Sequence, residues 1–140
     1  MEISFDIHRT CNSIKIDACR NKRSIAFAKL FLHEHPAQNC AWLTEIYVSP
    51  KFRGRGIGSK VLLQANGIVS DLALPAFLYA HSSELPQRIL LRFYAKHGWT
   101  QLNNLFYGVK PNYMYYLPEG VQKDALSPVF QGFIRSMYNV

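Results

Sequence analysis

Residues 42–60, WLTEIYVSPKFRGRGIGSK, decide the fold that the sequence predicts. An apolar, strand-like run stops at Pro50, a basic and glycine-dense turn follows, and VLLQANGIVSD then has helical spacing. Gly54, Gly56 and Gly58 leave the start of that helix open, because glycine lacks a Cβ and tolerates positive φ. The unpaired N–H groups at a helix N-terminus bind phosphate, so this turn is predicted to bind a phosphate or pyrophosphate.

The turn does not match the two best-known phosphate-binding motifs. A Walker loop requires GxxxxGK[ST], but here Lys60 is misplaced and the loop is too short. A dinucleotide fingerprint requires GxGxxG, whereas residues 54–58 read GxGxG. What remains is R-x-x-G-x-G, from Arg53 to Gly58, directly after a strand that ends in YVSP.

Hydrophobic periodicity outside this stretch predicts a mixed α+β domain. The order of elements is four strands, helix, strand, helix, two strands and a terminal helix. We expect strands at 2–8, 13–18, 24–33, 42–48, 74–80, 105–110 and 112–117, and helices at 58–71, 86–97 and 127–138. The strands at 42–48 and 74–80 should run parallel, because a helix connects them as a right-handed crossover.

The composition is that of an ordinary folded domain. The chain has 140 residues, of which 49% are hydrophobic and 18% charged, so we expect one domain with one proper core. No apolar run reaches the ~18 residues of a membrane helix, and the N-terminus has no signal pattern. We therefore expect a cytoplasmic protein without a membrane partner. Cys11, Cys19 and Cys40 fit no zinc spacing and are predicted to be free thiols, so no metal is expected.

The formal net charge of +7 favours a polyanionic ligand or partner. Nucleic acid, an acidic protein surface and a cofactor with several phosphates all satisfy this charge. A basic surface that is simply solvated is the alternative without functional meaning.

Two blocks together resemble the GCN5-related N-acetyltransferase (GNAT) superfamily. EIYVSPKFRGRGIGSKVL resembles the strand–loop–helix block whose Q/R-x-x-G-x-G/A loop binds the pyrophosphate of acetyl-coenzyme A. FYAKHGW, residues 93–99, resembles the family's F-Y-x-K-x-G-F block and follows at the usual distance. The resemblance covers roughly residues 42–100.

This resemblance implies a central, mostly antiparallel twisted sheet of about six or seven strands with one parallel central pair, flanked by helices. It also implies acyl transfer from acetyl-CoA to a primary amine by direct attack, with both substrates bound together. Two of the expected elements depart from the family pattern. Only RTCN separates strands 2–8 and 13–18, where many members have a pair of helices, and the terminal helix 127–138 is an addition.

The resemblance assigns a role to several residues. Tyr94 aligns with the tyrosine that donates a proton to the sulfur of coenzyme A, and Glu45 lies near the carboxylate that acts as general base. His33, His35 and His81 are alternative bases. A family asparagine that touches the cofactor is replaced here by Gln87, and Trp99 replaces the usual Phe. The predicted cofactor-binding residues are Ile46, Tyr47, Val48, Arg53, Gly54, Arg55, Gly56, Ile57, Gly58, Ser59, Gln87 and Lys96.

The sequence does not identify the acceptor amine. A protein lysine or N-terminus, a small amine and an aminoacyl-tRNA all remain open, with a mild preference for an anionic macromolecule from the charge. Tyr113 and Tyr115 are predicted to lie on one face of the last strand, for core packing, a dimer edge or an acceptor pocket. The rival hypothesis is an inactive acyl-CoA-binding module that binds nucleic acid or protein through its basic face. A homodimer through strand edges or through the terminal helix is a further hypothesis, because the final hairpin offers an edge that needs protection.

Overall fold

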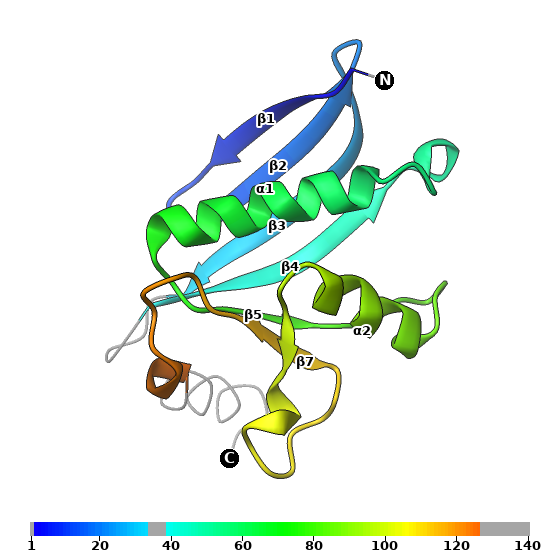
Figure 1. Cartoon of the computed structure of the whole chain (residues 1–140). Coiled ribbons are helices and arrows are strands. Elements are labelled where there is room, and N and C mark those ends of the chain that lie inside the picture. The colour runs from blue at the N-terminus through cyan, green and yellow to red at the C-terminus, as the bar shows by residue number, and fades with distance from the viewer. Residues whose placement is uncertain (1, 34–38, 127–140) are drawn as a thin grey trace.

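The computed structural model describes residues 2–33 and 39–126, and its centre is a single seven-stranded sheet (Figure 1). The strand order is β1-β2-β3-β4-β5-β7-β6. The strands are β1 (Ser4–Arg9), β2 (Ser13–Arg20), β3 (Arg23–His33), β4 (Cys40–Val48), β5 (Ala76–Tyr79), β6 (Thr100–Gln101) and β7 (Tyr113–Tyr116). The helices are α1 (Ile57–Leu72) and α2 (Gln87–Lys96), with short 3-10 turns η1 (Pro50–Phe52), η2 (Leu102–Asn104) and η3 (Lys123–Ala125).

The pairing of strands confirms the predicted mixed topology. Strands β4 and β5 are parallel, and α1 connects them, whereas the other pairs in the sheet are antiparallel. A parallel pair needs such a crossover, because a tight turn cannot return the chain to the same end of the sheet. The crossover places the N-terminus of α1 beside the end of β4, where the glycine-rich turn lies.

The first two strands form a plain hairpin. Residues 10–12 alone connect β1 to β2, so no helix lies between them. Thr10 closes this turn, since its side-chain hydroxyl accepts a hydrogen bond from the Ser13 N–H at 3.1 Å. The expected loss of the N-terminal helix pair is confirmed.

The two faces of the sheet are covered differently. The main core cluster lies between the sheet and both helices, which pack on the same face (Figure 1). A second cluster lies on the opposite face, over β4, β5 and β7, with the partly buried Phe31 of β3 packed against it; its buried members are Cys40, Trp42, Phe77, Leu102, Tyr113, Tyr115 and Leu126. As predicted, Tyr113 and Tyr115 share one face of β7, while Met114 belongs to the main cluster.

The predicted strand at 105–110 is wrong. These residues form turns, and β7 pairs instead with β5 and with the two-residue strand β6. Gly108 has φ +83°, which a regular strand does not permit, and Tyr107 is fully exposed. The predicted terminal helix 127–138 lies outside the described residues.

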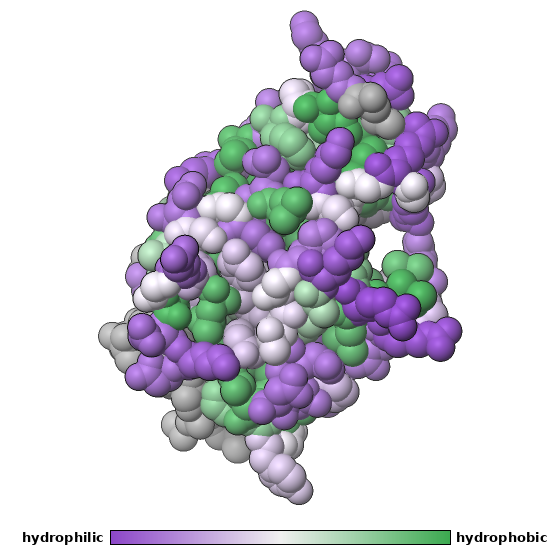
Figure 2. All heavy atoms as spheres, viewed as in Figure 1, coloured by the Kyte–Doolittle hydropathy of each residue, from purple (hydrophilic) through white to green (hydrophobic). Residues whose placement is uncertain are grey.

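The described helices are short and amphipathic. None of them is long and apolar enough to cross a membrane. Helix α2 ends as the sequence predicts: Gly98 takes φ +92°, and the Trp99 N–H donates to the Tyr94 carbonyl at 3.2 Å. Figure 2 shows that the surface on the helix side is mainly hydrophilic, with small apolar patches between.

Candidate functional site

The central parallel pair opens into a cleft. Strands β4 and β5 pair only from Ala41 to Leu43. Thr44 then forms a bulge in β4. The neighbours Lys29 and Leu30 of β3 pair with Glu45 and Leu43, which leaves Thr44 between them without a partner in the register. A bulge adds one residue to a strand and bends it. Beyond Leu43, the side of β4 that faces β5 has no strand partner among the described residues, and a cleft of about 730 Å³ lies where the two strands diverge. An opening in the space-filling view separates the segment after β4 from the part that carries α2 (Figure 2).

The glycine-rich turn and the start of α1 form one wall of this cleft. Gly56 is the N-cap of α1 in the left-handed conformation, and no side chain caps the helix. A Cβ on Gly54 or Gly56 would meet no protein atom within 4 Å, so the positive φ at both positions, and not crowding, requires glycine. Gly58 differs, because it is helical and packs on Val48 and Phe93. The uncapped N–H groups of Ile57, Gly58 and Ser59 therefore line the cleft.

The side chain of Arg53 turns away from that helix end. Its Nε donates to the Val48 carbonyl at 2.9 Å, and its guanidinium forms an ion pair with Glu84 and lies 5.8 Å from the Tyr47 ring centroid. Arg53 thus joins the end of β4 to the segment after β5. The sequence motif gave no sign of this contact.

Tyr94 of α2 lies at the inner end of the cleft. It is 7% exposed, packs against Phe93 and Trp99, and lines the cleft. Burial raises the pKa of Tyr94 to about 12. The phenol therefore remains protonated at neutral pH and keeps a proton to donate.

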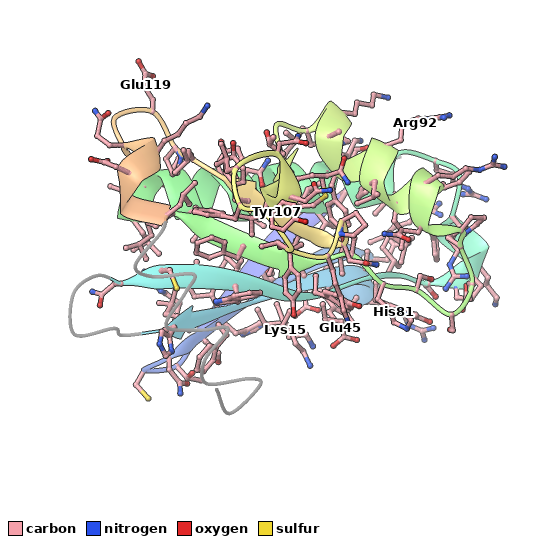
Figure 3. All side chains as sticks on the ribbon, turned by 90° about the horizontal axis from the view of Figure 1, so that it is seen from below. Lys15, Glu45, His81, Arg92, Tyr107 and Glu119 are labelled. Carbon is pink, nitrogen blue, oxygen red and sulfur yellow. The ribbon has the colours of Figure 1, made fainter. Side chains whose placement is uncertain are left out.

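Glu45 projects from the face of the sheet opposite to the two helices. Figure 3 shows Lys15, Glu45 and His81 on the face away from α1 and α2, whereas Arg92 lies on the helix side. Glu45 and His81 both line the cleft, so two candidate bases reach it from β4 and from the segment after β5. His33 ends β3 and does not line the cleft, and His35 lies outside the described residues.

Most of the predicted site residues meet at this cleft, and three do not. Lining residues include Glu45, Ile46, Tyr47, Val48, Arg53, Gly54, Gly56, Ile57, Gly58, Ser59 and Tyr94. Gln87 and Lys96 lie exposed at the two ends of α2 and do not line it. Arg55 does not line it either, and its guanidinium lies 5.5 Å from the Phe52 ring centroid.

The sequence did not predict the outer wall that follows β5. Tyr79, Ser82, Ser83, Glu84 and Leu85 line the cleft there. Ser82 shapes this wall, because its hydroxyl accepts hydrogen bonds from the N–H groups of Glu84 and Leu85, at 3.0 and 3.2 Å. The run SSELP between a strand and a helix is a detectable turn signal, although it does not reveal which wall the turn forms.

A buried amide fixes the two helices relative to each other. Asn66 of α1 accepts from Trp99 Nε1 at 3.0 Å and donates to the His97 carbonyl at 3.0 Å. Both groups of this side chain are therefore satisfied in the core. The contact holds the end of α2, and with it Tyr94, against α1.

This geometry agrees with a comparison of sequences. Residues 2–99 match the profile of the acetyltransferase (GNAT) family. The chain belongs to this family. No curated protein matches the chain significantly.

Solved structures show the same fold at low identity. The PaiA N-acetyltransferase from Thermoplasma acidophilum, in complex with coenzyme A, is 20% identical over 76% of this chain, with a TM-score of 0.58. The chain spans only 61% of that protein's length. The anti-CRISPR protein AcrVA5 is 20% identical over 75% of this chain and is itself 98% covered, with a TM-score of 0.58. AtaTR bound with AcCoA is 14% identical over 84% of this chain and 72% covered, with a TM-score of 0.59.

The residues of this GNAT-family cleft suit a nucleotide thioester. The open N–H groups of α1 and the space beside Gly54 and Gly56 fit an anionic pyrophosphate. The unpartnered side of β4 offers main-chain groups to an extended arm. Among the described residues, no group of acidic, histidine or cysteine side chains has the arrangement of a metal site.

Proposed function

We propose that this GNAT-family chain transfers the acetyl group of acetyl-CoA to a primary amine, by direct attack in a ternary complex. One observation supports this proposal above all. A single cleft joins the uncapped start of α1, the unpartnered side of β4, the buried Tyr94 and the open-face Glu45. These are an anion-binding end, a place for an extended arm, an acid and a base, which are the parts that the reaction needs.

Each part has a definite task in the proposed reaction. The N–H groups from Arg53 to Ser59 bind the pyrophosphate, and main-chain groups of Ile46, Tyr47 and Val48 hold the pantetheine arm and polarise the thioester carbonyl. Glu45 accepts a proton from the acceptor ammonium, directly or through water, because an amine with a pKa of ~10.4 is otherwise protonated. Tyr94 donates a proton to the departing thiolate.

The acceptor enters from the open face in this proposal. Glu45 is 50% exposed and lies on the side of the sheet away from the helices (Figure 3). Over β1–β3, the described part of the chain places no element on this face. A macromolecular acceptor such as a protein lysine suits such an open approach better than a small amine, which needs an enclosing pocket. A bound tRNA is the less favoured macromolecule, because carboxylates alternate with lysines on this face.

Thermal unfolding with and without acetyl-CoA tests the proposed function. A ligand at about 100 times its dissociation constant should add about 2.7 kcal/mol to the free energy of unfolding. Gly56→Glu should abolish this gain, because it forces a side chain into positive φ and places a carboxylate beside the pyrophosphate. Gly67→Ala is the matched control: it lies in α1, its Cβ meets nothing within 4 Å, and the gain should persist. Equal gains in wild type and Gly56→Glu would contradict the proposal.

A further inference from the structure

The candidate general base already has an amine beside it. Lys29 of β3 faces Glu45 of β4 in the sheet, and its Nζ lies 3.6 Å from Glu45 Oε1. The two side chains are 48% and 50% exposed, so neither is locked in the core. A primary amine thus occupies the position, relative to the base, that the reaction requires of an acceptor.

Lys29 does not line the cleft itself, but it contacts a residue that does. Glu45 lines the cleft and stands on the open face, so the amine that contacts it lies at the cleft's edge. The Phe27 ring centroid is 5.4 Å from Lys29 Nζ and supports the side chain across the sheet surface. With only residues 10–12 between β1 and β2, no helix there separates Lys29 from the cleft.

We propose that Lys29 is an intramolecular acceptor, and that the enzyme acetylates its own Lys29 side chain. This inference rests on the proposed function. Glu45 takes a proton from the Lys29 ammonium, the freed amine attacks the thioester carbon, an amide C–N bond forms and the C–S bond breaks. The coenzyme A thiolate takes a proton from Tyr94, which is reprotonated from water. The attacking nitrogen loses its second proton to solvent as the amide forms, which offsets the proton that Tyr94 takes from water, so the net products are acetyl-Lys29, free coenzyme A and the proton left on Glu45.

Acetylation would change the site for later substrates. An acetylated lysine carries no charge, so the ion pair with Glu45 is lost. Glu45 is then free to receive the ammonium of an external acceptor.

Lys15 provides an internal control on the same face. Its Nζ lies 4.9 Å from the same Phe27 ring, and its side chain is 43% exposed. However, Lys15 pairs with Asp17 at 3.6 Å and stands one strand farther from the cleft. Non-enzymatic acetylation would modify the two lysines to similar extents, whereas transfer assisted by Glu45 selects Lys29.

The test is peptide mass mapping of the full chain after incubation with acetyl-CoA. We expect acetylation of Lys29 to exceed that of Lys15 by about tenfold or more. A positioned base raises a rate by ~100-fold or more, so a tenfold preference is a lower bound. The rate per molecule should not depend on protein concentration, because the transfer is intramolecular. Glu45→Gln and Tyr94→Phe should each abolish the preference for Lys29, while Lys15→Arg should leave Lys29 acetylation unchanged.

Two results would overturn the inference and leave the proposed function intact. One is thermal stabilisation by acetyl-CoA without acetyl-Lys29; the other is equal labelling of Lys15 and Lys29. A lack of stabilisation by acetyl-CoA would instead refute both proposals. Lys29→Arg keeps the charge beside Glu45 but removes the acceptor, so a remaining one-acetyl mass increase in this variant would also count against Lys29.

Discussion

The face of the sheet away from the helices has a packed half over β4, β5 and β7 and a bare half over β1–β3. Glu45 of β4, which lines the cleft, meets the bare half at Lys29 of β3. Over β4, β5 and β7, the second cluster buries aromatic and aliphatic side chains. Over β1–β3, the same face presents Lys15, Asp17, Phe27 and Lys29, held in ion pairs and ring contacts. We propose that the packed half contributes stability, whereas the bare half and the cleft edge serve chemistry.

The largest expected effect tests the packed half. Leu102 is 0% exposed in the second cluster, so Leu102→Ala should lower the free energy of unfolding by about 3 kcal/mol. Stabilisation by acetyl-CoA should be the same as in wild type, because Leu102 does not line the cleft. Urea unfolding with and without ligand measures both quantities. If the ligand no longer stabilises this variant, the two halves are coupled and the comparison is wrong.

Tyr94→Phe tests the cleft, and we expect it to lower activity while the stability of the fold is kept. Loss of the phenol proton should lower kcat by about 100-fold, while the ring preserves packing and stabilisation by acetyl-CoA. Tyr116→Phe is the matched control, since its hydroxyl contacts Ser70 at 3.3 Å and does not line the cleft. Release of free thiol with an amine acceptor measures kcat. Equal losses in the two variants would remove Tyr94 from the role of acid.

The burial of Tyr94 also predicts a dependence of stability on pH. Its folded pKa of about 12 lies above the unfolded value of about 10, so the unfolded chain loses this proton first. This contribution is fully present below pH ~10 and is lost as the pH rises toward ~12. Between about pH 9 and 11, the unfolding free energy of wild type should fall by about 1 kcal/mol more than that of Tyr94→Phe. Urea unfolding at several pH values measures both free energies. If those of wild type and Tyr94→Phe fall in parallel as the pH rises, the burial of the Tyr94 phenol is contradicted.

The glycine-rich turn and the end of α2 could be predicted because their signals are local. Gly54 and Gly56 need positive φ, and FYAKHGW combines a helical stripe with the Gly98 stop; each feature lies within a few residues of chain. The family resemblance added the roles of Tyr94 and Glu45, which periodicity alone does not supply. The parallel pair followed from the helix between its strands.

The parts that could not be predicted depend on distant partners. LFYGVK reads as a strand, yet the neighbour of β7 is the two-residue β6, whose pairing no local pattern specifies. The contact of Arg53 with Glu84 crosses 31 positions of sequence, and so does the link from Asn66 to His97. The ion pair of Lys29 with Glu45 required the register of two strands and a bulge.

The smallest expected effect concerns the outer wall of the cleft. Glu84 holds the Arg53 guanidinium, and their side chains are 61% and 41% exposed, so the pair contributes at most about 1 kcal/mol. Glu84→Gln should free Arg53 for the anionic cofactor and raise the affinity for acetyl-CoA by about threefold at low salt. This gain should disappear at high salt, because screening weakens exposed charges.

Glu119→Gln separates a specific effect of Glu84 from a general effect of charge. It makes the same change of charge on an exposed residue at the other end of the molecule from His81 and Arg92 (Figure 3). Isothermal titration with acetyl-CoA at two salt concentrations compares the variants. An equal rise in affinity for both would mean that net charge alone acts on the cofactor. A rise for Glu84→Gln alone would mean that Arg53 exchanges Glu84 for the cofactor, so that this pair in the cleft wall competes with acetyl-CoA for the guanidinium.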